Sequence, residues 1–96
     1  MLFVVMLTDR PGTAALRQQW LPAHLEWLRS ETAILQAGSL REEPDANAVG
    51  GCWIVNAANQ TAVESLLHSD PFWTCGLRDT VRILLWSVAF PERVQA

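Results

Sequence analysis

The chain has 96 residues, enough for one domain and too few for two, so we expect a single domain over residues 1–96. Its net charge of −3 argues against nucleic-acid binding, since no basic stripe is available to neutralise phosphates. Half of the residues are hydrophobic, yet no apolar stretch approaches the ~20 residues of a membrane helix. The apolar run of residues 2–7 is too short for a signal-peptide core and lacks a basic start, so we expect it not to act as one. A cytoplasmic protein without nucleic-acid or membrane partners is expected.

The first predicted elements are a strand and a long helix. Residues 2–7 are apolar at every position, which is typical of a strand buried on both faces. A turn at 9–12 leads to Thr13, a good N-cap, and residues 14–29 are predicted to be helical. Pro22 removes a backbone donor within this helix, so we expect a kink or a restart there.

Two further strands are predicted in the middle of the chain. Residues 34–40 form the first of them, and the polar run 41–49 is expected to be a flexible loop. The pair Gly50 and Gly51 then opens a strand over residues 52–56.

A second helix and a last strand complete the pattern. Thr61 and Glu64 have the spacing of a capping box, and the helix that follows must end near Ser69 because a proline comes soon after. A short turn is expected over residues 71–77. Residues 80–90 are apolar on both faces and predict a long final strand.

The order β-α-β-β-α-β is typical of the α+β ferredoxin-like fold. Two helices can cover one face of a four-stranded antiparallel sheet, but the predicted strands are apolar on both faces. The second face therefore needs another cover. We expect a homodimer in which sheet packs against sheet to form a dimeric α/β barrel.

His24 and Asp70 are the candidate catalytic residues. An imidazole can take or give a proton near neutral pH, and a carboxylate bonded to its far nitrogen fixes the tautomer and stabilises the imidazolium. Asp70 would orient His24, which would act as the general base. Such proton transfer needs neither a metal nor an organic cofactor, and the sequence has no metal-ligand cluster or glycine-rich phosphate loop, so we expect no cofactor.

Aromatic residues beside this pair suggest an apolar ligand site. Trp20, Phe72 and Trp73 are candidate substrate-binding residues, and such walls suit a small, flat aromatic or enol-type molecule. The alternative for the tryptophans is a place in the core or at the dimer interface.

Both catalytic candidates also have structural explanations. Asp70 before a proline has the pattern of an N-cap, a role that does not exclude catalysis. A lone histidine among apolar residues is often a satisfied core residue. His68 is a competing partner for Asp70, but its place in the second helix predicts a solvent-facing side chain.

Several short motifs resemble the YCII-related (YciI-like) family of dimeric α/β-barrel proteins. The matching pieces span nearly the whole chain and are Pro22-Ala23-His24-Leu25, Leu35-Gln36-Ala37-Gly38, Gly50-Gly51, Asp70-Pro71-Phe72, Gly76 and a final strand through Trp86. The resemblance implies a ferredoxin-like protomer, a dimer, and an active site built on a His–Asp pair, which here is His24 and Asp70.

The chain departs from the family pattern at three places. Members often carry arginine where this chain has Leu21, and the missing cation weakens the case for an anionic substrate. Thr32 stands where a glycine often ends the first helix. Ser39 replaces a proline after the Ala-Gly pair, and its hydroxyl is a candidate substrate contact, or else satisfies a backbone group at the strand end.

The favoured function is a cofactor-independent small-molecule enzyme, a lyase, isomerase or dehydrochlorinase-like catalyst. The resemblance supports this class because relatives within the broader fold include a dehydrochlorinase, muconolactone isomerases and cofactor-free monooxygenases. A non-catalytic small-ligand-binding protein and an accessory dimeric protein remain alternatives. A binding protein would capture an aromatic ligand without product, and an accessory protein would use His24 and Asp70 for stability alone.

Overall fold

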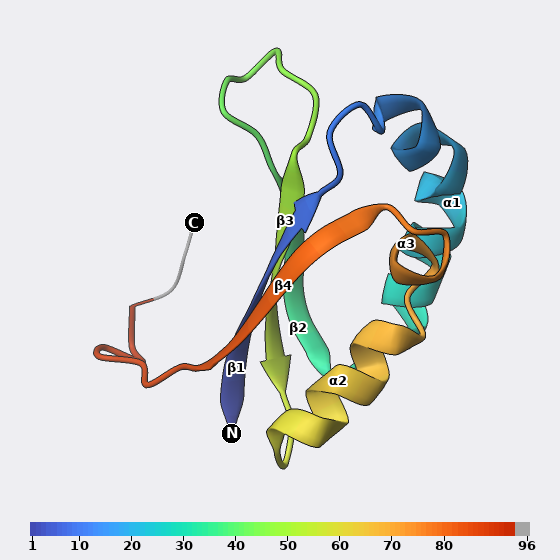
Figure 1. Cartoon of the computed structure of the whole chain (residues 1–96). Coiled ribbons are helices and arrows are strands. Elements are labelled where there is room, and N and C mark those ends of the chain that lie inside the picture. Colours follow the sequence, from blue (N-terminus) through green and yellow to red (C-terminus); the bar gives the residue numbers. More distant parts are fainter. Residues whose placement is uncertain (94–96) are drawn as a thin grey trace.

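The structure, a computed structural model, describes residues 1–93 and contains one antiparallel sheet with helices on one side (Figure 1). Along the chain the elements are β1 (Leu2–Asp9), α1 (Ala14–Ser30), β2 (Ile34–Leu40), β3 (Gly50–Asn56), α2 (Gln60–His68), α3 (Pro71–Thr74) and β4 (Arg78–Leu85). The predicted ferredoxin-like order is confirmed, with the short helix α3 in place of part of the expected turn at 71–77.

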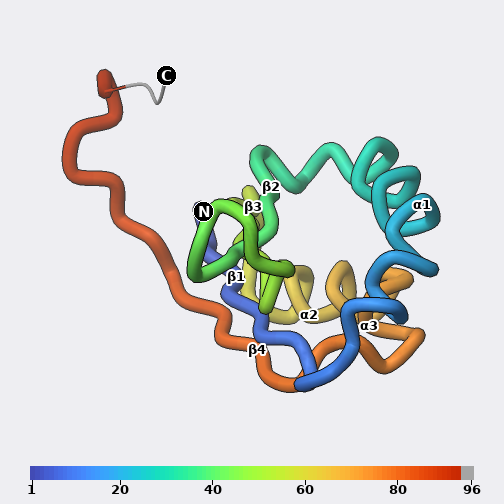
Figure 2. The backbone as a smooth tube through the Cα atoms, turned by 90° about the horizontal axis from the view of Figure 1, so that it is seen from above, coloured from blue at the N-terminus to red at the C-terminus, as the bar shows by residue number. Residues whose placement is uncertain are grey.

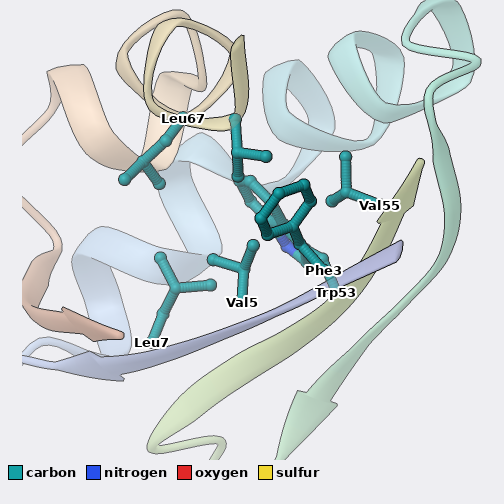
Figure 3. Close-up of a cluster of buried hydrophobic side chains, with 7 residues drawn as sticks. Phe3, Val5, Leu7, Trp53, Val55 and Leu67 are labelled. Carbon is teal, nitrogen blue, oxygen red and sulfur yellow. The ribbon is translucent and has the colours of Figure 1, made fainter. Parts of the chain in front are cut away.

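The sheet has the strand order β2-β3-β1-β4, so the first strand is central. Side chains alternate along a strand, and β1 therefore sends Phe3, Val5 and Leu7 toward the helices. Opposite them in the register lie Val55 and Trp53 of β3. Figure 3 shows these side chains converging under α2, where Leu67 closes the core.

Helix α1 runs without interruption through Pro22, so the expected restart does not occur. Proline leaves the carbonyl of Gln18 without its usual helical donor four residues later. Both residues are exposed, and water can satisfy that carbonyl. The loss of this one backbone hydrogen bond therefore costs the helix little free energy.

The N-cap of helix α2 lies two positions earlier than the one expected from the capping box, Thr61. Asn59 is the N-cap, with an extended backbone, and its side chain accepts a hydrogen bond from Ala62 N at 2.9 Å. Thr61 consequently lies inside the first turn, and Glu64 instead accepts a bond from the side chain of Gln60. Asparagine is preferred over threonine as an N-cap, which explains the error.

The last strand is shorter than the predicted 80–90 and begins earlier, at Arg78. Its final bond to the sheet joins Trp86 N to the carbonyl of Leu2, at the first residue of β1. Beyond that point no strand of residues 1–93 lies beside the chain, so residues 87–90 have no neighbouring strand to pair with. Figure 2 shows this segment leaving the body of the molecule.

The sheet has one covered and one open face. All three helices lie on the same side (Figure 1), as the alternation of buried side chains in β1 and β3 requires. The open face carries exposed apolar side chains, including Met6 and Leu84. In the described part of the chain, no helix is both long and apolar enough to cross a membrane.

Candidate active site

A cavity of about 230 Å³ lies between α1 and the sheet. Its walls come from one side of α1, from β2 and β3, and from the first residue of β4, so distant parts of the sequence meet there. The lining residues are Arg17, Leu21, His24, Leu25, Leu28, Ala37, Gly38, Ser39, Arg41, Trp53 and Arg78. An engineered apolar cavity of about 150 Å³ holds benzene, so this space can accept one substituted ring.

His24 and Asp70 meet at this cavity. His24 is the buried residue of α1, and its Nδ1 lies 2.7 Å from Oδ1 of the fully buried Asp70. A neutral imidazole that donates from Nδ1 keeps its lone pair on Nε2. No hydrogen bond engages Nε2 among residues 1–93, and His24 lines the cavity. The pair therefore leaves one basic nitrogen available to a ligand.

Asp70 has two tasks. Its backbone is extended and the carboxylate caps α3, accepting a bond from Phe72 N at 2.9 Å, with Pro71 at the first helical position. The same oxygen, Oδ1, accepts from His24, while Oδ2 is buried without a partner in the described chain. The structural and the catalytic interpretation of Asp70 are thus compatible in one geometry.

The ring of Phe72 supports the imidazole. It is fully buried and stacks on His24 with the ring centroids 4.0 Å apart and the planes at 13°. The guanidinium carbons of Arg17 and Arg78 lie 5.0 and 5.1 Å from the same ring centroid. Phe72 therefore contacts both the histidine and two cations of the cavity wall.

A second buried carboxylate, Asp9, holds these two arginines. Its Oδ2 accepts from Arg17 Nε at 3.0 Å and its Oδ1 from Arg78 Nη1 at 2.7 Å. A register irregularity between Thr8 and Asp9 makes the contact, because Thr8 faces Thr80 whereas Asp9 faces Arg78. A regular ladder would have placed Asp9 opposite Asp79. The bulge therefore places Arg78, instead of Asp79, opposite Asp9, and an ion pair forms where two carboxylates would have met.

The glycine pair at the start of β3, Gly50 and Gly51, contacts Arg17 and Arg78. The carbonyl of Gly50 accepts from Arg17 Nη2 at 3.0 Å. A side chain on Gly51 would place its Cβ 3.3 Å from Arg78 Nη2, so the missing side chain lets this guanidinium lie close to the strand. Gly50 itself has no room for a Cβ, which would fall 2.1 Å from the carbonyl oxygen of Leu7.

The candidate substrate-binding residues lie in different places. Ser39 lines the cavity, and its hydroxyl accepts from Arg41 Nη2 at 2.9 Å. Trp20 is exposed on α1 and Trp73 packs against the core, so neither is among the lining residues, and Phe72 lies behind His24. The indole in the wall is that of Trp53, which lies in the strand predicted over residues 52–56. His68 is exposed, as predicted.

The arginines are the site residues that sequence reasoning missed. The leucine at position 21, where family members often carry arginine, weakens the case for an anionic substrate, but Arg17, Arg41 and Arg78 all line the cavity. Arg17 lies four residues before Leu21 on the same helix face, and this spacing was a usable signal. The sequence around Arg78 carries no comparable signal, because the place of Arg78 in the site depends on the bulge in β1. Within residues 1–93, no three His, Cys, Asp or Glu side chains gather as a metal site.

Comparison with solved structures places this fold among known proteins. The 5-chloro-2-hydroxyhydroquinone dehydrochlorinase TftG from Burkholderia phenoliruptrix, solved in complex with 2,5-dihydroxybenzoquinone, is 27% identical over 91% of this chain and 94% of its own, with a TM-score of 0.83. SnoaB, a cofactor-independent oxygenase from Streptomyces nogalater, is 15% identical over 95% of this chain and 96% of its own, with a TM-score of 0.58. The second similarity is one of fold.

Sequence comparison gives the family. No curated protein sequence matches the chain. The YCII-related domain, in contrast, matches residues 1–87, which include both members of the His24–Asp70 pair and all three arginines of the cavity. The chain therefore belongs to the YCII-related domain family.

Proposed function

We propose that the chain is a cofactor-independent enzyme that moves protons on a small ring compound, with His24 as general acid and base and Asp70 as its orienting partner. The observation that carries this proposal is the 2.7 Å contact between Nδ1 and the buried carboxylate at the edge of a ring-sized cavity. The contact leaves the lone pair on Nε2, which is the form that a general base needs.

The proposed reaction transfers one proton from the ligand to His24 and then back to the ligand or to its leaving group. Nε2 of His24 takes a proton from a hydroxyl or an acidic carbon of the ligand, and the electron pair of that bond stays on the ligand. The imidazolium, held by Asp70, returns the proton to another atom of the ligand or to a departing group. This sequence of proton transfers accounts for isomerisation as well as for elimination of hydrogen chloride, and neither reaction requires an oxidant.

The substrate class follows from the cavity and from the similarity to TftG. Apolar side chains from α1 and the indole of Trp53 suit a single flat ring. The dehydrochlorinase that shares 27% of its residues with this chain acts on a chlorinated hydroquinone. Hydroquinones and related enols are therefore the first compounds to test, with chlorinated members included.

The test is a turnover assay on 5-chloro-2-hydroxyhydroquinone and a panel of hydroquinones and enols, followed by quinone absorbance and chloride release. We expect His24→Gln to lower turnover by at least about 100-fold, the lower end for lost acid–base catalysis. His68→Gln is the matched control, because His68 is the other histidine and lies exposed on α2.

Two outcomes would count against the proposal. Full turnover in His24→Gln would remove the histidine from the chemistry. Tight binding of ring compounds with no product from any of them would favour the non-catalytic binding protein.

We also propose that the working form is a homodimer with the open sheet faces packed together. Met6, Leu40 and Leu84 are exposed apolar residues of the sheet, and Trp86 and Phe90 in the segment that follows β4 are exposed as well. An accumulation of exposed apolar side chains on a sheet face is typical of an interface.

Sedimentation velocity tests the dimer. We expect a dimer at micromolar concentration, and a monomer after Met6→Glu places a charge in the middle of the open face. Gln19→Glu, on the exposed side of α1, controls for the added charge. A stable wild-type monomer would contradict this arrangement.

A further inference from the structure

We infer that the cavity selects ligands that carry an ionised oxygen, and that Arg41 at its edge is the residue that receives this oxygen. The inference deepens the proposed function, on which it rests only for the location of the ligand. It does not require that the ligand be converted.

The charge of the cavity wall is the first support. All seven basic residues of the chain are arginines, and three of them line this one cavity. No aspartate or glutamate of residues 1–93 lines it. The two carboxylates behind the wall, Asp9 and Asp70, balance one arginine and the histidine at most. The wall is therefore positive in a chain whose net charge is negative.

Two of the three arginines are committed to the protein. Arg17 bonds Asp9 and the carbonyl of Gly50, and Arg78 bonds Asp9 with a side chain that is 2% exposed. The Nε of Arg78 is buried without a partner in the described chain, so this cation is held in place with its hydrogen-bonding capacity unfilled. These two set the positive potential of the wall.

Arg41 differs because it is exposed and forms no ion pair with a carboxylate in residues 1–93. Its Nη2 donates to Ser39 and its Nη1 makes a longer bond, 3.3 Å, to the carbonyl of Ala46. A guanidinium has five donors, so three remain. Asp45 lines an adjoining hollow together with Arg41, yet no hydrogen bond or ion pair joins the two side chains.

Ser39 orients the guanidinium of Arg41. The hydroxyl lies in the cavity wall on β2, and its bond to Nη2 ties the guanidinium to the wall rather than to solvent. A charged oxygen on a bound ring would find a planar donor there that matches it in charge and geometry. The resulting specificity is for an enolate, a phenolate or a carboxylate over its neutral ether or amide.

The experiment compares two probes of the same ring by titration calorimetry with the full chain. 2,5-Dihydroxybenzoquinone is ionised at neutral pH, and 2,5-dimethoxybenzoquinone is not. We expect the anion to bind about tenfold tighter or more, with an affinity that falls as salt is added. Intact mass before and after titration excludes adducts at Cys52 and Cys75, which are both partly accessible.

The variant Arg41→Gln should lower the affinity for the anion by about ten- to hundredfold, the range for a lost charge-assisted hydrogen bond, and leave the neutral ether unaffected. Arg29→Gln is the matched control, since Arg29 lies on the exposed side of α1 with 78% of its side chain accessible. Equal affinity for the two probes, no binding of the anion at millimolar concentration, or an unchanged preference in Arg41→Gln would overturn the inference.

Binding in His24→Gln separates this inference from the proposed function. Retained anion preference without turnover supports both. Retained preference with full turnover removes the catalytic role of His24 and keeps the anion site. Loss of the preference through Arg41→Gln alone assigns selectivity to the arginine, whichever residue performs the chemistry.

Discussion

Two buried carboxylates stand behind the same cavity and hold different nitrogen-bearing side chains. Asp9 holds Arg17 and Arg78, whereas Asp70 holds His24. Arginine keeps its proton throughout the pH range of proteins, but imidazole exchanges a proton near neutrality. The first cluster can therefore supply only a fixed charge, and the second can take part in a reaction. The cavity joins the two functions without sharing residues between them.

The difference extends to the local backbone. Asp9 reaches its arginines because of a bulge at the end of β1, and Asp70 reaches its histidine because it begins a helix. The bulge at the end of β1 and the start of α3 each direct the side chain of an aspartate toward the interior. Within residues 1–93, the ring of Phe72 lies against side chains of both clusters, His24 in one and the two arginines in the other.

Removing the charge of Asp9 is expected to have the largest effect on stability. In Asp9→Asn, the guanidinium groups of Arg17 and Arg78 stay buried, with exposed fractions of 14% and 2%, and lose their counter-ion. We expect a loss of about 3–5 kcal/mol in the free energy of unfolding, measured by urea denaturation at fixed protein concentration. Asp79→Asn, an exposed neighbour, is the control and should change little. Equal losses in the two variants would mean that the ion pairs contribute no net stability.

The matching change at the other carboxylate should cost less. Asparagine at position 70 still caps α3, but it places an amide group where the unpartnered Oδ2 of Asp70 is buried. We expect Asp70→Asn to lose about 1–3 kcal/mol, and the ¹⁵N shifts of the His24 ring to report a smaller share of the form protonated on Nδ1. Asp45→Asn in the exposed loop is the control. Ring shifts identical to those of the wild type would show that Asp70 does not set the tautomer.

Changing the shared ring should have the smallest effect. Phe72→Leu keeps a buried apolar side chain but removes the stack on His24 and the contacts with two guanidinium groups. We expect a loss of about 1–2 kcal/mol. In the background of Asp9→Asn, the cost of Phe72→Leu should change, because a double-mutant cycle detects the coupling through the arginines. Strict additivity would mean that the ring and the Asp9 cluster are independent.

The sequence predicted the sheet because its signals are local. The apolar run of β1, the glycine pair before β3 and the helix of residues 14–29 each mark an element without reference to the rest of the chain. The end of the last strand did not follow from its own residues, since Trp86 to Phe90 are as apolar as the strand itself. What ends β4 is the lack of a neighbouring strand beyond Leu2.

The same distinction applies to the site. Asp70 could be recognised because an aspartate before a proline is a local helix-start signal, and His24 because an imidazole in the first helix can exchange a proton near neutral pH. The family resemblance supported this pairing. The arginine cluster could not be recognised in this way. Asp9 meets Arg78 only through a one-residue change of register, and no pattern near either residue reveals that change. Arg41 required knowledge of which loop borders the cavity.

One oxygen of Asp70 bonds both a helix N-terminus and an imidazole, and this has a consequence for interpreting related chains. Selection for folding alone is enough to retain an aspartate there, even in a protein that has lost its reaction. The aspartate is thus a poor marker of activity among homologues. His24 is the more informative position, because the cap of α3 depends on Asp70 alone and does not call for an imidazole.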